Sequence, residues 1–195
     1  MMKTRNKIII CLAIMGIVLF GLVQGVVIPR NNQKKNEHVV QQQNPVTHDL
    51  NSILKYKTKY MGAASNIINL FSTLPLIEGD TSFELFSETL TAQMNYKNAI
   101  ANINENMIKK TLIYNSTAAF ALVDNLEVIN YNFTDGEYKV LRSDVEKWYG
   151  TELSGLLSDE EWKSKVQNKL ESIEYVNNCA SAVLKKNDYF ALLLK

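Results

Sequence analysis

The sequence predicts an α+β domain that follows an N-terminal transmembrane helix, with an antiparallel sheet of about four strands in two hairpins and helices packed on one face. Three observations predict this architecture. Residues 8–28 carry no charge, residues 107–123 read as an almost continuously apolar helix, and the segments on either side of that helix alternate apolar and polar residues around turn residues. A helix between two hairpins gives the sheet and the helix a shared apolar face.

The first element is the membrane anchor. Twenty-one uncharged residues, 8–28, follow a short basic tail at residues 1–7. At about 1.5 Å per residue a helix of this length spans roughly 30 Å, the thickness of a bilayer's hydrocarbon core. The alternative is a cleaved signal peptide, whose apolar region usually has about 7–15 residues. A short N-terminal tail favours an N-terminus in the cytoplasm, although basic residues flank both ends of the span. We expect a single-pass protein of the cell membrane.

A flexible tether is predicted at residues 29–48. The segment is rich in Asn and Gln and shows no sustained apolar period. Both histidines of the chain, His38 and His48, fall within it. The remaining residues, 49–195, make one domain that we expect outside the cytoplasm.

The composition of residues 49–195 excludes some partners. They contain 15 Lys and Arg against 19 Asp and Glu, a net charge of −4. An acidic domain has no natural affinity for nucleic acid or for an anionic membrane surface. Cys179 is the only cysteine outside the span, so an intramolecular disulfide within the domain is impossible.

The first half of the domain begins with a short helix that Asp49 can cap. The lysines of residues 54–60 alternate with Tyr and Thr, which fits either solvated lysines beside packed tyrosines or an element near lipid headgroups. A helix over residues 63–73 is then stopped by Pro75. Residues 82–85 and 90–96 predict the first hairpin.

The second half is centred on the helix at residues 107–123, which is apolar on more than one side and should be the core helix. Residues 129–134 and 138–141 then alternate as strands, and Asp135-Gly136 between them predicts a type I′ hairpin turn. Capping boxes are predicted at residues 143–146 and 158–161. The second one opens a long amphipathic helix that runs to about residue 186. Residues 189–194 form a final strand or a docking tail.

Catalytic and metal motifs are missing from residues 49–195. Ser-His and Cys-His catalysis needs a histidine beside the nucleophile, and a structural zinc site needs more Cys and His than one cysteine supplies. The glycines are scattered, so they do not form a phosphate-binding loop. Acidic residues could pair as in a hydrolase, but surface solvation accounts for them better: Asp80, Glu84, Glu88, Asp124 and Glu127. We expect no enzyme, no cofactor and no metal.

Candidate binding residues come from one unusual side chain. Arg142 is the only arginine of residues 49–195, and its planar fork suits either a structural carboxylate pair or contact with a ligand. A pocket between the core helix and the sheet would place it near three other polar residues: Tyr60, Tyr96 and Asn125. Cys179 is expected to be a small buried residue, and a reactive thiol is the alternative.

Four segments resemble a family of bacterial domains of unknown function, number 4825, found on small membrane-anchored or secreted proteins of Gram-positive bacteria. They are residues 56–76, 83–96, 113–133 and 138–150. Two departures stand out. Residues 88–91 replace the family's usual Pro-Tyr-Gly turn, and Ala63-Ala64 replaces an Asp-Asn pair. The resemblance implies location and fold and adds no mechanism.

Three functions are open at this point. The leading hypothesis is a non-catalytic domain that binds another envelope protein or a peptide outside the membrane. A small-molecule or peptide sensor is the alternative, with its pocket at the four candidate residues. An envelope hydrolase that uses carboxylates is the third.

Overall fold

The computed structural model describes residues 12, 15–16, 19–28, 30, 37, 39–77 and 79–188. The chain divides into two compact units, Met1–Gln41 and Gln42–Lys195. Among the described residues of the whole chain, no helix has both the length and the apolar character that crossing a membrane requires. The tail at residues 1–7 and the segment 189–194 lie outside the described residues, as does part of the predicted span at 8–28.

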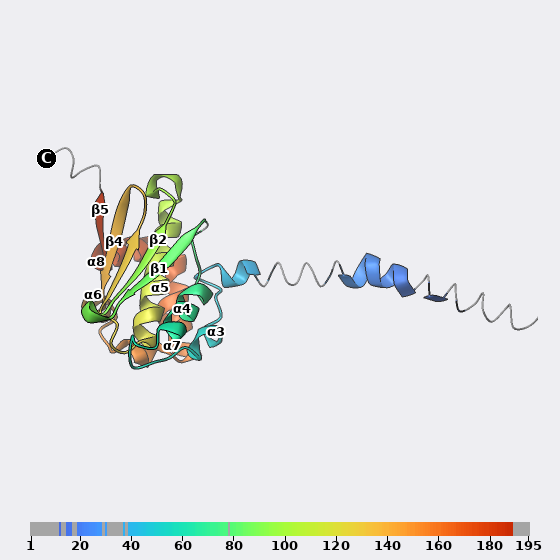
Figure 1. Cartoon of the computed structure of the whole chain (residues 1–195), viewed down its shortest axis with the longest axis horizontal. Helices are drawn as coiled ribbons and strands as arrows, with labels where there is room; N and C mark the ends of the chain where they lie inside the picture. The colour runs from blue at the N-terminus through green and yellow to red at the C-terminus, as the bar shows by residue number, and fades with distance from the viewer. Residues whose placement is uncertain are drawn as a thin grey trace, which may run out of the picture. The chain divides into compact units, whose positions relative to one another are not determined.

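The second unit contains a five-stranded sheet in the order β1-β2-β3-β4-β5 (Figure 1). The strands are β1 (Thr81–Phe86), β2 (Thr91–Tyr96), β3 (Val128–Asn132), β4 (Gly136–Leu141) and β5 (Leu184–Asp188). Both predicted hairpins are confirmed. The prediction of a purely antiparallel sheet is wrong, because β2 and β3 run parallel. The core helix between them carries the chain back across the sheet, and such a crossover makes consecutive strands parallel.

The fifth strand was not predicted. β5 pairs antiparallel with β4 from Leu184 to Asp188. Its sequence, LKKND, lacks the alternation of apolar and polar residues that marks a half-buried strand. The strand forms because the free edge of β4 offers backbone donors and acceptors.

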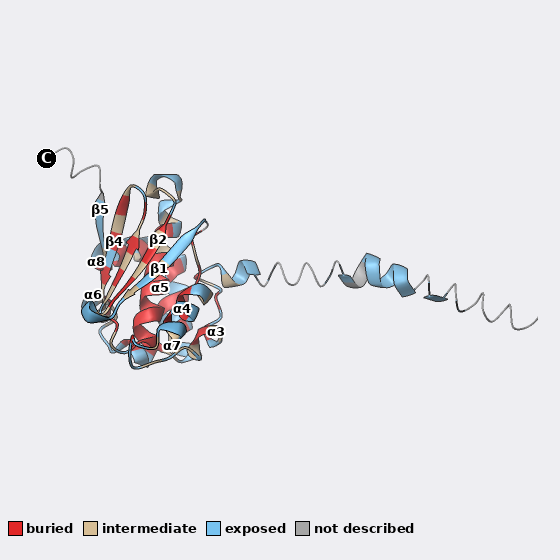
Figure 2. Ribbon diagram, in the orientation of Figure 1, coloured by how far each residue is buried: buried red, intermediate tan, exposed pale blue. Residues whose placement is uncertain are grey.

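The helices lie on one side of the sheet (Figure 1). They are α3 (Asn51–Leu54), α4 (Ala64–Thr73), α5 (Glu105–Leu122), α6 (Arg142–Tyr149), α7 (Asp159–Glu161) and α8 (Ile173–Val183). α5 is the predicted core helix, and every residue from Thr111 to Leu122 is buried (Figure 2). Its first turn is capped by Asn104, whose side chain accepts the backbone N–H of Met107.

The predicted single helix from residue 158 to about 186 is wrong. The Ser158 cap is confirmed, since its side chain accepts the N–H of Glu161. The chain then passes through a π-helical segment, Trp162–Gln167, and a 3-10 segment, Asn168–Glu171. Ser172 takes an extended conformation and caps α8. The helical period continues past this break in the sequence, so periodicity alone hides it.

Two turn predictions also differ from the structure. Neither Asp135 nor Gly136 has the positive φ that a type I′ turn requires. The Asp135 carboxylate instead accepts the backbone N–H groups of Ile100 and Ala101 at 2.6 and 3.1 Å, which ties the hairpin to a distant turn. The predicted capping box at residues 143–146 is wrong as well, because α6 begins at Arg142 without a side-chain cap.

The folded unit starts before the predicted boundary of the tether. It begins at Gln42, and Pro45 and His48 are buried in it. The Gln167 side chain holds this segment by donating to the carbonyl oxygens of His48 at 2.7 Å and Pro45 at 3.2 Å. Residues 42–48 therefore belong to the domain, although their composition is that of a linker.

Gly79, two residues before the start of β1, has a backbone conformation that favours glycine. Its φ is +125°, and an added Cβ would collide with the side chain of Asn98. We expect Gly79→Ala to lower the free energy of unfolding by about 1–2 kcal/mol, measured by urea denaturation. Gly62→Ala is the matched control, because a Cβ there meets nothing within 4 Å. Equal losses in the two variants would contradict the argument from φ.

Candidate functional site

A groove of about 420 Å³ opens at the C-terminal end of α5. Its lining comes from four places in the chain: Lys57; Phe120, Ala121 and Asp124; Arg142 and Glu146; and Glu152, Leu153 and Ser154. The end of α5, whose Phe120 and Ala121 are buried, lies beneath the groove, and α6 and the 3-10 turn Leu153–Leu156 supply one wall. The groove therefore forms where the core helix ends.

Arg142 holds this end of the domain together. Its Nη2 donates to the carbonyl oxygens of Phe120 at 2.8 Å and Val123 at 2.5 Å, and its Nε donates to Leu126 at 2.7 Å. A helix leaves its last carbonyl groups without intrahelical partners, and a cation there also offsets the negative end of the helix dipole. The guanidinium carbon lies 5.2 Å from the centre of the Phe120 ring. Arg142 thus caps α5 from outside the helix.

Carboxylates complete the surroundings of Arg142. Its Nη1 lies 3.4 Å from Glu146 Oε1 and its Nε 3.9 Å from Glu127 Oε1. The side chain is only 12% exposed. The structural pairing that the sequence suggested is present, and the carbonyl groups add to it. The guanidinium can still face a ligand from the floor of the groove.

Lys57 reaches the groove because its neighbour pairs with the end of α5. The N–H of Thr58 donates to the Leu122 carbonyl at 2.8 Å, and the N–H of Asp124 donates to the Thr58 carbonyl at 3.0 Å. This isolated parallel bridge between Thr58 and Val123 fixes the backbone on both sides of the groove. Lys57 and Asp124 are both exposed, so the ammonium group and the carboxylate are available to a ligand.

The groove offers both signs of charge. Lys57 and Arg142 are cations, whereas Asp124, Glu146 and Glu152 are anions. Such a lining can bind a carboxylate and an amine of one ligand at the same time, by charge-assisted hydrogen bonds. This chemistry suits a peptide segment with mixed charges or a small zwitterion.

The four candidate residues from the sequence do not line one pocket. Tyr60 is 68% exposed, and Asn125 accepts the backbone N–H of Met61 at 2.8 Å. Asn125 and Arg142 both lie at the end of α5, but only Arg142 lines the groove. Tyr96 ends β2 at the opposite end of the sheet, roughly 17 Å away along a six-residue strand.

Tyr96 is a core residue. It is buried and stacks on Phe133 with 4.8 Å between the ring centres. Its hydroxyl has no hydrogen-bond partner among the described residues, and burial raises its pKa. The prediction that Tyr96 lines a pocket between the helix and the sheet is wrong, because aromatic packing fills the space around this residue.

The groove residues that the sequence reasoning missed are Lys57, Glu146, Glu152 and the Leu153–Ser154 pair. Lys57 carried a weak signal as one of the alternating lysines, and Asp124 was noted at the end of the core helix. Glu146 and Glu152 carried none, since exposed acidic residues are common on helices and loops. Their position depends on how α6 packs at the end of α5.

A second polar cluster is buried around His48. His48 Nε2 lies 3.1 Å from the Thr73 carbonyl oxygen, which can only accept, so Nε2 carries the proton. Nδ1 then accepts the hydroxyl proton of Tyr114 at 2.8 Å, and the Tyr114 oxygen accepts Nε1–H of Trp162 at 3.3 Å. Burial lowers the pKa of His48 and keeps the ring neutral, although the Thr73 bond and Asp49 oppose this shift. The cluster joins four segments that are distant in the sequence.

The remaining candidates are explained by packing or solvation. Burial raises the pKa of the Cys179 thiol to about 12, so the thiolate is scarce at neutral pH. Asp80 pairs with Lys97 at 3.0 Å on the surface. Glu84 accepts a hydrogen bond from Asn95 at 2.9 Å. Among the described residues, no group of three or more His, Cys, Asp or Glu could hold a metal ion.

Comparison with known proteins gives one match. Residues 53–142 match the model of the family described as a domain of unknown function, DUF4825, and the resemblance found in the sequence is confirmed over that range. No curated protein and no solved structure matches the chain. The matched range runs from α3 to Arg142 and includes Lys57, α5 and Asp124.

Proposed function

Residues 53–142 match the model of the DUF4825 family, whose activity is unknown. From the sequence and the geometry of this chain, we propose that it is a single-pass membrane protein that holds this domain outside the cytoplasm. The domain binds another envelope protein or a peptide and does not catalyse a reaction. The binding site is the groove at the end of α5.

The groove is the observation that carries this proposal. Its two cations and three anions lie over the buried side chains of Phe120, Ala121 and Leu153, so the surface that it offers a partner is mainly polar. Charges of both signs in one groove give orientation and specificity to a protein or peptide contact. The anchor rests on the uncharged run at residues 8–28 and on the basic residues before it.

The location is tested with a protease and a C-terminal tag. We expect the tag to be cut in intact cells once the cell wall is removed, while the chain stays in the membrane fraction. A tag that is protected until the cells are lysed would contradict the orientation. A chain released into the medium would instead indicate a cleaved signal peptide.

The binding site is tested by charge reversal in the groove. Lys57→Glu and Asp124→Lys change exposed residues, so the fold should persist. We expect each reversal to reduce the yield of a reproducible crosslinked partner in intact membranes by roughly tenfold, the loss of one or two charged contacts. Lys163→Glu, on the exposed surface of the π-helical segment, is the matched control. Equal crosslinking in all three variants would exclude the groove.

A small-molecule sensor is the second candidate, and the same groove favours it. Arg142 and Lys57 could bind a carboxylate while Asp124 or Glu152 binds an amine, as in an amino acid or a dipeptide. A saturable rise in melting temperature with a panel of dipeptides would support this function. Crosslinking to one protein with no response to the panel would favour the partner instead.

A further inference from the structure

The face of the sheet that points away from the helices is polar, and amide side chains lie at its centre. The strand register places residues of all five strands side by side in two rows across this face. One row is Ser82, Asn95, Asn132, Glu137 and Asn187, and the other is Glu84, Gln93, Asn130, Lys139 and Lys185. At the centre, on β2 and β3, four carboxamides lie together.

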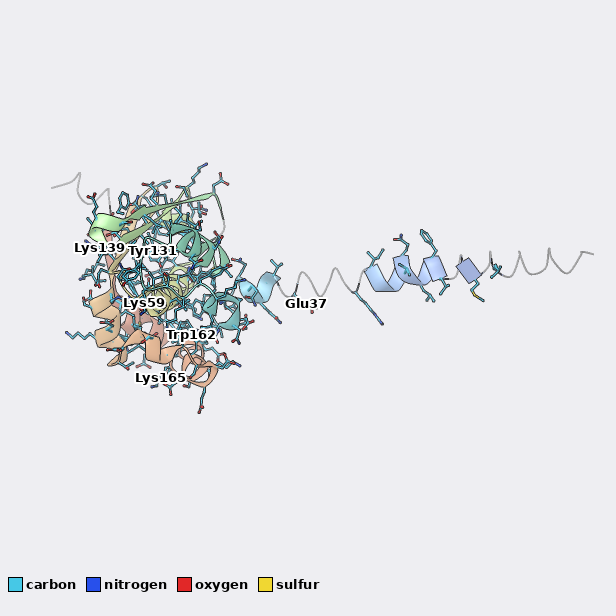
Figure 3. The ribbon with its side chains drawn as sticks, turned by 60° about the horizontal axis from the view of Figure 1, so that its bottom comes forward. Glu37, Lys59, Tyr131, Lys139, Trp162 and Lys165 are labelled. Atoms are coloured by element: carbon cyan, nitrogen blue, oxygen red, sulfur yellow. The ribbon has the colours of Figure 1, made fainter. Side chains whose placement is uncertain are left out.

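This face is open, whereas the opposite face forms the core. Ala92, Met94, Ile129 and Tyr131 alternate with the four carboxamides along β2 and β3, and all of these apolar residues are buried. The members of the two rows are exposed or half-buried. Figure 3 shows Lys139 at the outer edge of the domain, and β1 is exposed along most of its length in Figure 2.

The central carboxamides already form a partial network. Gln93 Nε2 donates to Asn95 Oδ1 at 3.1 Å, and Asn132 Nδ2 donates to the same oxygen at 2.9 Å. Asn95 Nδ2 donates to Glu84 Oε1 at 2.9 Å. These bonds fix the side chains in position before any ligand arrives, which lowers the entropy cost of binding.

The network leaves hydrogen-bonding capacity unused. Each carboxamide has two N–H donors and an oxygen with two lone pairs. Asn132 Oδ1 has no partner among the described residues, but it is buried and out of a ligand's reach. The half-buried Asn130 side chain makes no hydrogen bond within that part of the chain and is the open position. A ligand that hydrogen-bonds the half-buried Asn130 carboxamide therefore gains affinity.

The charges of the face select a neutral ligand. Glu84 and Glu137 balance Lys139 and Lys185, and they flank the neutral centre. Lys185 is further paired with Asp144 at 2.7 Å. A strongly charged polymer therefore finds no complementary field here. Phe86, 42% exposed, ends β1 beyond the amide rows and offers one apolar contact.

We propose that this face docks an extended polypeptide segment of the partner through its backbone. Carboxamides two residues apart on one strand repeat at about 6.6–6.8 Å, which is also the two-residue repeat of an extended peptide. A peptide that runs along β2 and β3 therefore meets an amide at every second residue. Gln93 and Asn130 can each donate to a peptide carbonyl and accept from a peptide N–H, whereas Asn95 already accepts two bonds within the network. The inference rests on the proposed function for its partner, but it uses a different surface.

The test follows the side-chain NH₂ signals of the four carboxamides by NMR, in the full-length chain held in detergent micelles. The probe is a peptide of about ten alternating Thr and Ser residues, which are neutral and favour extended backbone. Its twin carries an N-methyl group at every second residue and so lacks those N–H donors. We expect the four signals to shift saturably with the first peptide and to stay in place with the twin.

Asn130→Ala removes one amide that makes no bond in the described part of the fold, so the variant should fold normally. We expect it to raise the dissociation constant of the peptide roughly three- to tenfold. Asn178→Ala, exposed on α8, is the matched control and should change nothing.

Three results would overturn the proposal: no shift at the highest peptide concentration, equal shifts with the N-methylated twin, or shifts with dextran and none with the peptide. The last would mark a glycan-binding face. Lys57→Glu separates the two surfaces, because it should weaken crosslinking at the groove and leave the carboxamide signals unchanged. If the peptide caused no shift of the carboxamide signals while crosslinking at the groove persisted, this inference would be wrong and the proposed function would stand.

Discussion

Replacing Arg142 with alanine is expected to lower the free energy of unfolding by about 3–4 kcal/mol. The substitution leaves the carbonyl groups of Phe120, Val123 and Leu126 without their donor, and these groups lie where water has limited access. It also leaves Glu146 and Glu127 close together without their shared cation. The contact with the Phe120 ring is lost as well. Urea denaturation of the full-length chain measures the effect.

Two further variants identify the cause. Arg142→Lys keeps the charge, but an ammonium group cannot donate to three carbonyl groups as the planar guanidinium does. We therefore expect it to lower the free energy of unfolding by about half as much as Arg142→Ala. Lys147→Ala removes an exposed cation from the same helix and should cost less than about 0.5 kcal/mol. If Arg142→Lys were as stable as the natural chain, charge alone would explain Arg142 and the capping geometry would not matter.

The same residue shows how far the sequence could predict the site. Arg142 stood out because no other arginine occurs in residues 49–195. Its partners could not be predicted, since Phe120, Val123 and Leu126 reach it only after β3 and β4 have folded back. Tyr96 was assigned to the same pocket, between the core helix and the sheet. The parallel pairing of β2 and β3 places it at the other end of the sheet.

Local patterns predicted the elements that local physics determines. α4 is set by its apolar spacing and the following proline, and both hairpins by alternation and turn residues. The parallel pairing and β5 depend on where α5 and α8 deliver the chain, which no window of the sequence contains. The amide face was hidden for a related reason. Asn130 and Asn132 looked like the solvent side of one strand, and only the register sets Gln93 and Asn95 beside them.

One departure from the family turns out to have a structural counterpart. Leu90 lies in the segment where the family usually has Pro-Tyr-Gly, and it has φ +51°, a left-handed conformation that favours glycine. Its carbonyl oxygen accepts the N–H groups of Glu127 at 2.9 Å and Val128 at 3.1 Å. These bonds fix the start of β3 and offset the strain of a leucine at this position.

Lowering the pH below about 6.5 is expected to destabilise the fold through His48. The folded pKa of His48 is depressed from the ordinary value of 6.5, mainly because the ring is buried. Below that value the unfolded chain binds a proton that the folded chain does not, so stability falls as the pH drops. Protonation would also turn Nδ1 into a donor facing Tyr114, whose oxygen already accepts from Trp162.

His48→Gln tests this expectation by removing the titrating group. At pH 7.5 we expect it to lower the free energy of unfolding by about 2 kcal/mol, because the bonds to Tyr114 and Thr73 are lost together. Between pH 6.5 and 5 the variant should lose less further stability than the natural chain, since carboxyl groups titrate mostly below this window. His38→Gln, the other histidine of the chain, is the matched control. If the natural chain and His48→Gln showed the same slope with pH, His48 would not be the titrating group, and its role would be limited to packing residues 42–48 against the core.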